Sequence, residues 1–132
     1  MQTLAQELRP EAVRLVKVGQ TFLRERKWFG QHLPALPPMI MFFSDHHKPE
    51  AYYEPRNNAI LINTWHIARN GSSLKTAVCC GMASYTCQLM YNMAKEIHTR
   101  ALNVRTAMRP TLHAYKSARW HYYYDHFMAA IK

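Results

Sequence analysis

Three of the five residues from 34 to 38 are proline, and this segment divides the chain into parts that fold differently. Proline fixes φ and has no N–H to donate, so the segment cannot continue a helix. Before it, apolar residues recur at three- and four-residue spacing across Thr3–Phe29, which predicts a long helix with one buried face. Because proline suits the first turn of a helix, we predict that the main helix begins at Pro10.

Short strands are predicted after the prolines. Apolar runs at residues 39–43, 51–53 and 59–63 have the composition of strands. Polar turns separate them, at Ser44–Pro49 and again at Glu54–Asn58, where proline and asparagine suit a tight connection. Since no long crossover joins neighbouring strands, the pattern favours an antiparallel or mixed sheet of three strands.

The rest of the chain is predicted to be helical. A short helix covers about residues 64–69, and Ser72 or Ser73 is suited to cap a longer helix over Leu74–Ile97. A last helix is predicted over Leu112–Ile131. The order of one helix, three strands and then helices predicts an α+β fold, and 132 residues are enough for a single domain.

Composition narrows the class of protein. The 17 Lys and Arg outnumber the 8 Asp and Glu, which gives a net charge of +9. No apolar run reaches the roughly 20 residues that a membrane-spanning helix needs, so no membrane role is expected. The start lacks the basic-then-apolar order of a signal peptide, and three cysteines do not suit a secreted disulfide scaffold. We therefore expect a cytoplasmic protein.

The positive charge gathers near the C-terminus, where six basic residues and one acid follow Ile97. The basic residues are Arg100, Arg105, Arg109, Lys116, Arg119 and Lys132. Such an excess attracts an acidic protein surface or nucleic acid. No RNP, KH, zinc-finger or basic-zipper pattern accompanies the charge, so the case for nucleic acid rests on electrostatics alone.

An aromatic run at Trp120–Phe127 lies in the same region. On a helix these side chains surround the axis, so some rings face solvent or a partner, while Trp120, Tyr124 and Phe127 are predicted to face the core. Exposed Tyr and Trp beside Arg are favoured at protein interfaces and also stack on single-stranded bases. The predicted partner-binding surface comprises Arg105, Arg109, Arg119, His121, Tyr122 and Tyr123.

The segment AYYEPRNNAILIN fills residues 51–63, and the helix that follows contains the hexapeptide CGMASY at residues 80–85. This order resembles the zincin metallopeptidases, especially the small SprT-like and ImmA-like families, over roughly Pro38–Met93. In those families a strand with a Tyr and a Pro-Asn turn leads to an edge strand ending in Asn, then a short helix. The next helix carries the zinc motif His-Glu-x-x-His, often with Met at the third position, where this chain has Met82.

The resemblance implies a zincin-like fold without the chemistry of the zinc motif. In active zincins the two histidines bind zinc and the glutamate is the general base. Cys80, Gly81 and Ser84 stand at those three positions. Gly81 has no side chain to take a proton, and the Ser84 hydroxyl is a poor zinc ligand. The resemblance therefore implies a degenerate, non-catalytic zincin.

The cysteines do not rebuild a metal site by themselves. Cys80 and Cys87 share a helical face, but seven residues separate them by roughly 10 Å along the axis. Two thiolates on one zinc lie within about 4.6 Å, and a disulfide needs Cα atoms within about 7 Å. We therefore predict three buried, packing thiols. A Cys–His site would require Cys80 to meet His113 or His121 of the last predicted helix.

These observations predict a non-enzymatic binding module on a zincin-like scaffold, with no cofactor. Small, solitary, degenerate versions of enzyme domains are typical of phage and mobile-element proteins. The expected role is that of an inhibitor or adaptor acting on a host protein or nucleoprotein complex with an acidic surface. Two alternatives stay open: a metallopeptidase with an atypical Cys/His zinc site, and a basic nucleic-acid-binding protein.

Overall fold

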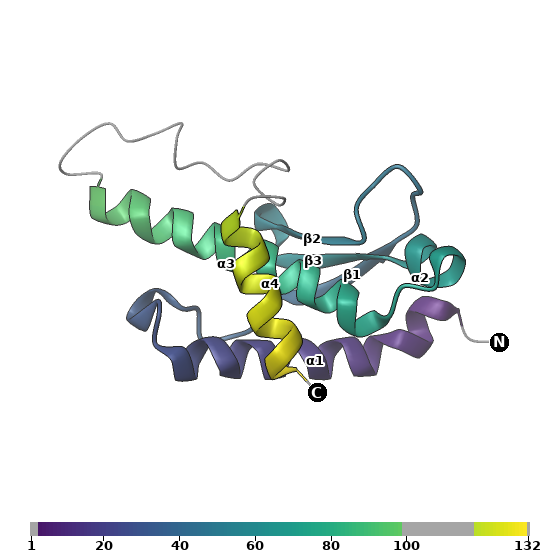
Figure 1. Ribbon diagram of the computed structural model, residues 1–132, viewed down its shortest axis with the longest axis horizontal. Helices are drawn as coiled ribbons and strands as arrows, with labels where there is room; N and C mark the ends of the chain where they lie inside the picture. The colour runs from purple at the N-terminus through teal and green to yellow at the C-terminus, as the bar shows by residue number, and fades with distance from the viewer. Residues whose placement is uncertain (1–2, 99–117, 132) are drawn as a thin grey trace.

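The computed structural model describes residues 3–98 and 118–131. In chain order its main elements are α1 (Leu4–Arg26), β1 (Met39–Phe43), β2 (Ala51–Glu54), β3 (Ala59–Asn63), α2 (Thr64–Asn70), α3 (Leu74–His98) and α4 (Ala118–Ala130). Short 3-10 turns at Gly30–His32 and Pro55–Asn57 complete them. The fold is α+β, as predicted, with an N-terminal helix, a three-stranded mixed sheet and C-terminal helices (Figure 1).

Helix α1 begins at its capping residue rather than at its proline. The Thr3 hydroxyl accepts a hydrogen bond from the Gln6 backbone N–H at 3.2 Å, and the Gln6 side chain accepts one from the Thr3 N–H at 2.9 Å. This capping box satisfies donors of the first turn. Pro10 lies inside the helix on an exposed position, so the predicted start at Pro10 is wrong. The predicted buried face comprises Ala12, Leu15, Val16, Gly19, Phe22 and Leu23; all of these are buried except Phe22, which is half-buried.

The sheet has the order β1-β3-β2. Strand β1 runs parallel to β3, with Ile40 opposite Ile60, and β2 runs antiparallel to β3, with Tyr53 opposite Ile60. The zincin resemblance implied that residues 59–63 form an edge strand, and this is wrong because β3 is central. A strand that pairs on both sides and packs beneath a helix is buried along most of its length, as β3 is.

Asn63 ends β3 and organises the connections around it. Its fully buried side chain donates to the backbone oxygens of Asp45, Lys48 and Pro49, at 2.6, 3.2 and 3.1 Å. Its side-chain oxygen accepts from the Trp65 N–H at 3.1 Å, which caps α2. One asparagine therefore fixes both the loop between β1 and β2 and the start of the short helix.

Helix α3 is the centre of the molecule. It packs against β2 and β3 on one side and against α1 and α4 on others, and Figure 1 shows α4 running across α3 and α1. Its first half is therefore buried nearly all round, including Ala77, Val78, Cys79, Cys80, Met82, Ala83, Tyr85 and Thr86. Within the described residues, no helix has both the length and the apolar character that crossing a membrane requires.

Candidate partner-binding site

The residues at the positions of the zinc motif have structural roles in packing the helix against the sheet. Cys80 is 5% exposed, and Gly81 is buried against the sheet. A Cβ added to Gly81 would overlap Cγ2 of Ile60, a branched side chain on the central strand. Glycine at this position therefore allows α3 to approach β3 closely.

Ser84 has a structural partner on the edge of the sheet. Its hydroxyl accepts a hydrogen bond from the Tyr53 backbone N–H at 3.0 Å. In the antiparallel pair of β2 and β3, alternate residues direct their backbone groups away from the partner strand, and Tyr53 is one of these. Ser84 therefore accepts a hydrogen bond from the Tyr53 N–H, which points away from β3 at the outer edge of the sheet.

The described residues contain no group of three or more His, Cys, Asp or Glu side chains that could hold a metal ion. Cys80 is buried on α3, whereas His121 is exposed on α4 with its ring 4.9 Å from that of Trp120. His113 lies outside the described residues. Cys79 is buried and Cys87 half-buried, and burial raises the pKa of their thiols to about 12 and about 11.

The structure places some residues of the predicted partner-binding surface on the exterior and others inside. Arg119 and His121 are exposed on α4, and Tyr122 is 54% exposed. Tyr123 is only 2% exposed, so it packs mostly into the core, although its ring lines the hollow described below. Residues three and four apart share a helical face, and Tyr123 therefore follows the buried residues Trp120 and Phe127 inward. Arg105 and Arg109 lie outside the described residues.

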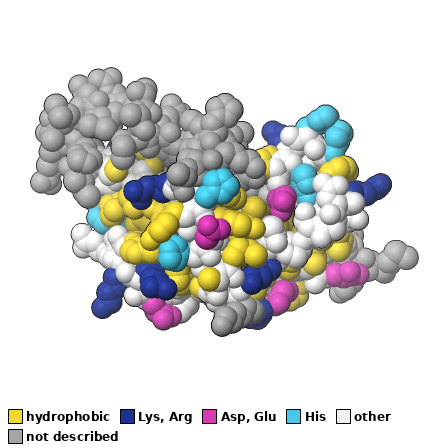
Figure 2. All heavy atoms as spheres, viewed as in Figure 1, with side chains coloured by type: hydrophobic (Ala, Val, Ile, Leu, Met, Phe, Trp, Pro, Cys, Tyr) yellow, Lys and Arg dark blue, Asp and Glu magenta, His cyan; other side chains and the backbone are white. Residues whose placement is uncertain are grey.

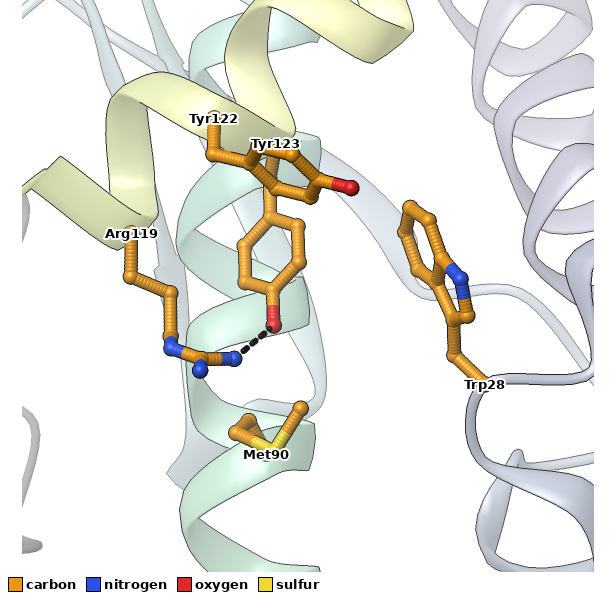
Figure 3. A pocket seen from close by; sticks show the side chains of 5 residues that line it. All are labelled: Trp28, Met90, Arg119, Tyr122 and Tyr123. Atoms are coloured by element: carbon orange, nitrogen blue, oxygen red, sulfur yellow. Dashed lines mark hydrogen bonds between the residues drawn. The ribbon is translucent and has the colours of Figure 1, made fainter.

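An open hollow of about 660 Å³ lies where α4, α3 and the end of α1 meet. We call it the tryptophan hollow; among the residues that the structure describes, it is lined by Trp28, Met90, Arg119, Tyr122 and Tyr123. Figure 3 shows the Trp28 ring facing the two tyrosines from the opposite side, with Met90 below them. Trp28 was not among the residues predicted from the sequence.

Aromatic contacts hold Trp28 in place beside α4. Its ring lies 5.7 Å from those of Tyr123 and His126 and 6.2 Å from that of Tyr122, measured between centroids. Phe22 packs edge-on against it at 5.9 Å. These separations fall in the range of favourable aromatic pairs, so the wall of the hollow is formed before any ligand arrives.

Arg119 supplies the positive charge of the hollow. Its Nη1 donates to the Tyr123 hydroxyl at 2.9 Å, as Figure 3 shows. Burial raises the pKa of Tyr123, although Arg119 works against the shift, so the phenol stays protonated at neutral pH. Among the residues that the structure describes, no carboxylate lies within ion-pair distance of Arg119. Most of its five N–H donors therefore remain for a ligand.

A second hollow, of about 480 Å³, lies along α1. Its lining residues are Arg14, Lys17, Val18, Thr21, Phe22, Glu25 and Ala130. Phe22 joins the two regions, because it lines this hollow and also contacts Trp28 and Phe127. Figure 2 shows hydrophobic side chains at the surface where α4 crosses the molecule, with basic, histidine and acidic side chains beside them.

No protein-family model, curated protein or solved structure matches the chain. The fold and the surface still define a class: an α+β protein with an aromatic, basic hollow built from three elements.

Proposed function

We propose that this protein is a non-catalytic binding module that holds a protein partner through the tryptophan hollow, which includes Tyr122, and the adjoining residue His121. The observation that carries the proposal is Arg119, exposed beside the aromatic wall with no carboxylate partner among the described residues. Tyr, Trp and Arg contribute most to the energy of protein interfaces. A net charge of +9 favours a partner with an acidic surface.

In this proposal the scaffold is zincin-like and has lost its chemistry. Two features support the loss of chemistry. The Gly81 position is taken up by the close approach of Ile60, and the Ser84 hydroxyl is engaged with the Tyr53 N–H. A glycine packed against the sheet supplies no general base, and a serine that accepts a backbone hydrogen bond is a poor zinc ligand. The protein acts on its partner as an inhibitor or adaptor, by occupying a surface rather than by cutting it.

Metal content tests the proposal against a metallopeptidase. The full chain, purified without a His-tag, is analysed for zinc after dialysis against metal-free buffer. We expect far less than one zinc per chain, because the described residues offer no ligand set. One tightly held zinc per chain would contradict the proposal and favour an atypical Cys/His site.

A mobility-shift assay tests the proposal against a nucleic-acid binder. We expect no shift of a duplex or a single-stranded oligonucleotide at about 50 mM salt, where electrostatic binding is strong. A shift that weakens steeply with added salt would favour the nucleic-acid alternative. The variant Arg119→Gln would then reduce binding to all sequences alike.

A further inference from the structure

We infer that the tryptophan hollow takes one large aromatic side chain of an acidic peptide, with a neighbouring carboxylate of that peptide bound to Arg119. The inference rests on the proposed function and names the chemistry that this surface recognises. The occupant is a peptide segment of a protein partner, anchored by one side chain and one charge.

The size and lining of the hollow fit an aromatic anchor. Its volume of about 660 Å³ lies within the range of roughly 300–1,000 Å³ that is usual for ligand sites. Trp28 and Tyr122 offer ring surface, and the Met90 side chain lies below them, as Figure 3 shows. Aromatic rings pair favourably with a further ring, and the flexible, polarisable thioether of methionine adapts to it.

The position of Arg119 fits a carboxylate next to that anchor. Its bond to the Tyr123 hydroxyl, 2.9 Å long, fixes the guanidinium at the side of the hollow. A guanidinium held in this way loses little conformational freedom on binding, and its planar donors match the two oxygens of a carboxylate. Asp125, the one acid on α4, makes no ion pair with it.

The charge of the hollow favours a peptide over a nucleic acid. Among the described lining residues Arg119 is the single cation. Nucleic-acid affinity comes from several phosphates neutralised together, which the single cation of the described lining does not provide. One cation beside three aromatic rings is the arrangement of a protein hot spot, where an anchor side chain fills a pocket and one charge orients it.

Indole signals of the full chain allow a direct test. The chain has three tryptophans, so its ¹⁵N spectrum contains three indole N–H signals, assigned by single substitutions. Three blocked peptides serve as probes: acetyl-Glu-Trp-Glu-amide, acetyl-Gln-Trp-Gln-amide and acetyl-Glu-Ala-Glu-amide. We expect the first to shift the Trp28 signal saturably and to leave Trp65 and Trp120 in place. The other two should bind at least about fivefold more weakly, since each lacks one of the two contacts.

Three variants separate the contributions. In Arg119→Gln the preference for Glu-Trp-Glu over Gln-Trp-Gln should disappear, whereas Arg69→Gln, which removes an exposed cation on α2, should retain it. Tyr122→Ala should weaken both tryptophan peptides. For Arg119→Gln and Tyr122→Ala an unchanged Trp65 signal, and for Arg69→Gln an unchanged Trp120 signal, report that the variant is folded, because those indoles lie far from the substituted residue in sequence.

Three results would overturn the inference. They are no shift of Trp28 with any peptide, a carboxylate preference that persists in Arg119→Gln, and an oligothymidine that shifts Trp28 at lower concentration than the peptides do. The proposed function fails separately. A protein partner whose capture depends on Arg119 would support that function even where these peptides do not bind.

Discussion

At the scale of single residues, two helical glycines meet very different neighbours. A Cβ on Gly81 would overlap Cγ2 of Ile60, which is branched and fixed on the central strand. A Cβ on Gly19 would come within 2.8 Å of Cε of Met82, the far end of a flexible side chain. Rigid neighbours cannot move aside, whereas a methionine can turn. The close contact at Gly81 is therefore the more restrictive one.

We expect Gly81→Ala to lower the free energy of unfolding by about 1–2 kcal/mol, because overpacking outweighs the gain in helix propensity. Gly19→Ala is the matched control and should be neutral or stabilising. Chemical denaturation of both variants measures the difference. The substitution Ile60→Ala should lower the free energy of unfolding by less in the Gly81→Ala variant than in the wild type, since it removes the methyl group that overlaps the new Cβ. A Gly81→Ala variant as stable as the wild type would contradict the close packing.

Ser84 provides a second prediction at this scale. In Ser84→Ala the Tyr53 N–H loses its acceptor, which we expect to cost about 1–2 kcal/mol of stability. Hydrogen exchange at the Tyr53 amide should quicken in that variant by more than exchange elsewhere in the sheet. Ser44→Ala, at an exposed serine after β1, is the control and should change neither quantity. Unaltered exchange at Tyr53 would show that the bond contributes nothing.

At the scale of elements, the sequence predicted the strand bounds and the helix caps that depend on neighbouring residues in the chain. The bounds of β1 and β3 match the predicted runs 39–43 and 59–63, because prolines or polar turns border compact apolar segments. The serine-capped start of α3 was predicted in the same way, and the Ser73 hydroxyl accepts from the Thr76 N–H at 3.0 Å. The start of α1 was missed because the helix begins after the capping box at Thr3 and continues through Pro10, which lies on its exposed face.

Other features of the elements depend on tertiary structure. The central place of β3 follows from a parallel pairing with β1, which brings together strands that are not neighbours in sequence. Tyr123 could have been placed inward from its spacing to Trp120 and Phe127, which the buried face of α4 shares. Trp28 carried no such signal, because its partners lie on α4, far along the chain.

At the scale of the whole molecule, the burial of ionisable side chains around α3 makes the free energy of unfolding depend on pH in the alkaline range. Burial raises the pKa of Cys79 from 9.0 to about 12 and that of Tyr53 to about 12. Well below pH 9 these groups are protonated in both the folded and the unfolded chain, so they add no pH dependence. Above it the unfolded chain releases protons that the folded chain retains, which favours unfolding.

We therefore expect the free energy of unfolding to fall steadily as pH rises from about 9 to about 12. Urea denaturation at pH 8, 9, 10 and 11 measures the trend. Cys79→Ala should show a shallower decline, since one of the retained protons is gone. Stability that stays level or rises over this interval would contradict the burial of these groups.

The arrangement of the whole molecule also explains why the candidate site could be predicted only in part. Arg119 and Tyr122 were predicted from charge and aromatic composition, and they lie on the surface. The hollow itself joins the end of α1, the middle of α3 and the first turns of α4, so no stretch of sequence contains it. Its shape emerges only when three helices pack together.

Photo-crosslinking tests most directly whether the protein holds a protein partner through the tryptophan hollow. A benzoylphenylalanine at position 122, in the full chain expressed in its source cells, reports what lies against α4; the same probe at position 56, on an exposed turn, is the control. We predict a protein adduct from position 122 that is absent from position 56. Arg119→Gln should abolish this adduct, whereas Arg69→Gln should leave it intact. Equal adducts from both positions, or adducts that persist in Arg119→Gln, would contradict the account.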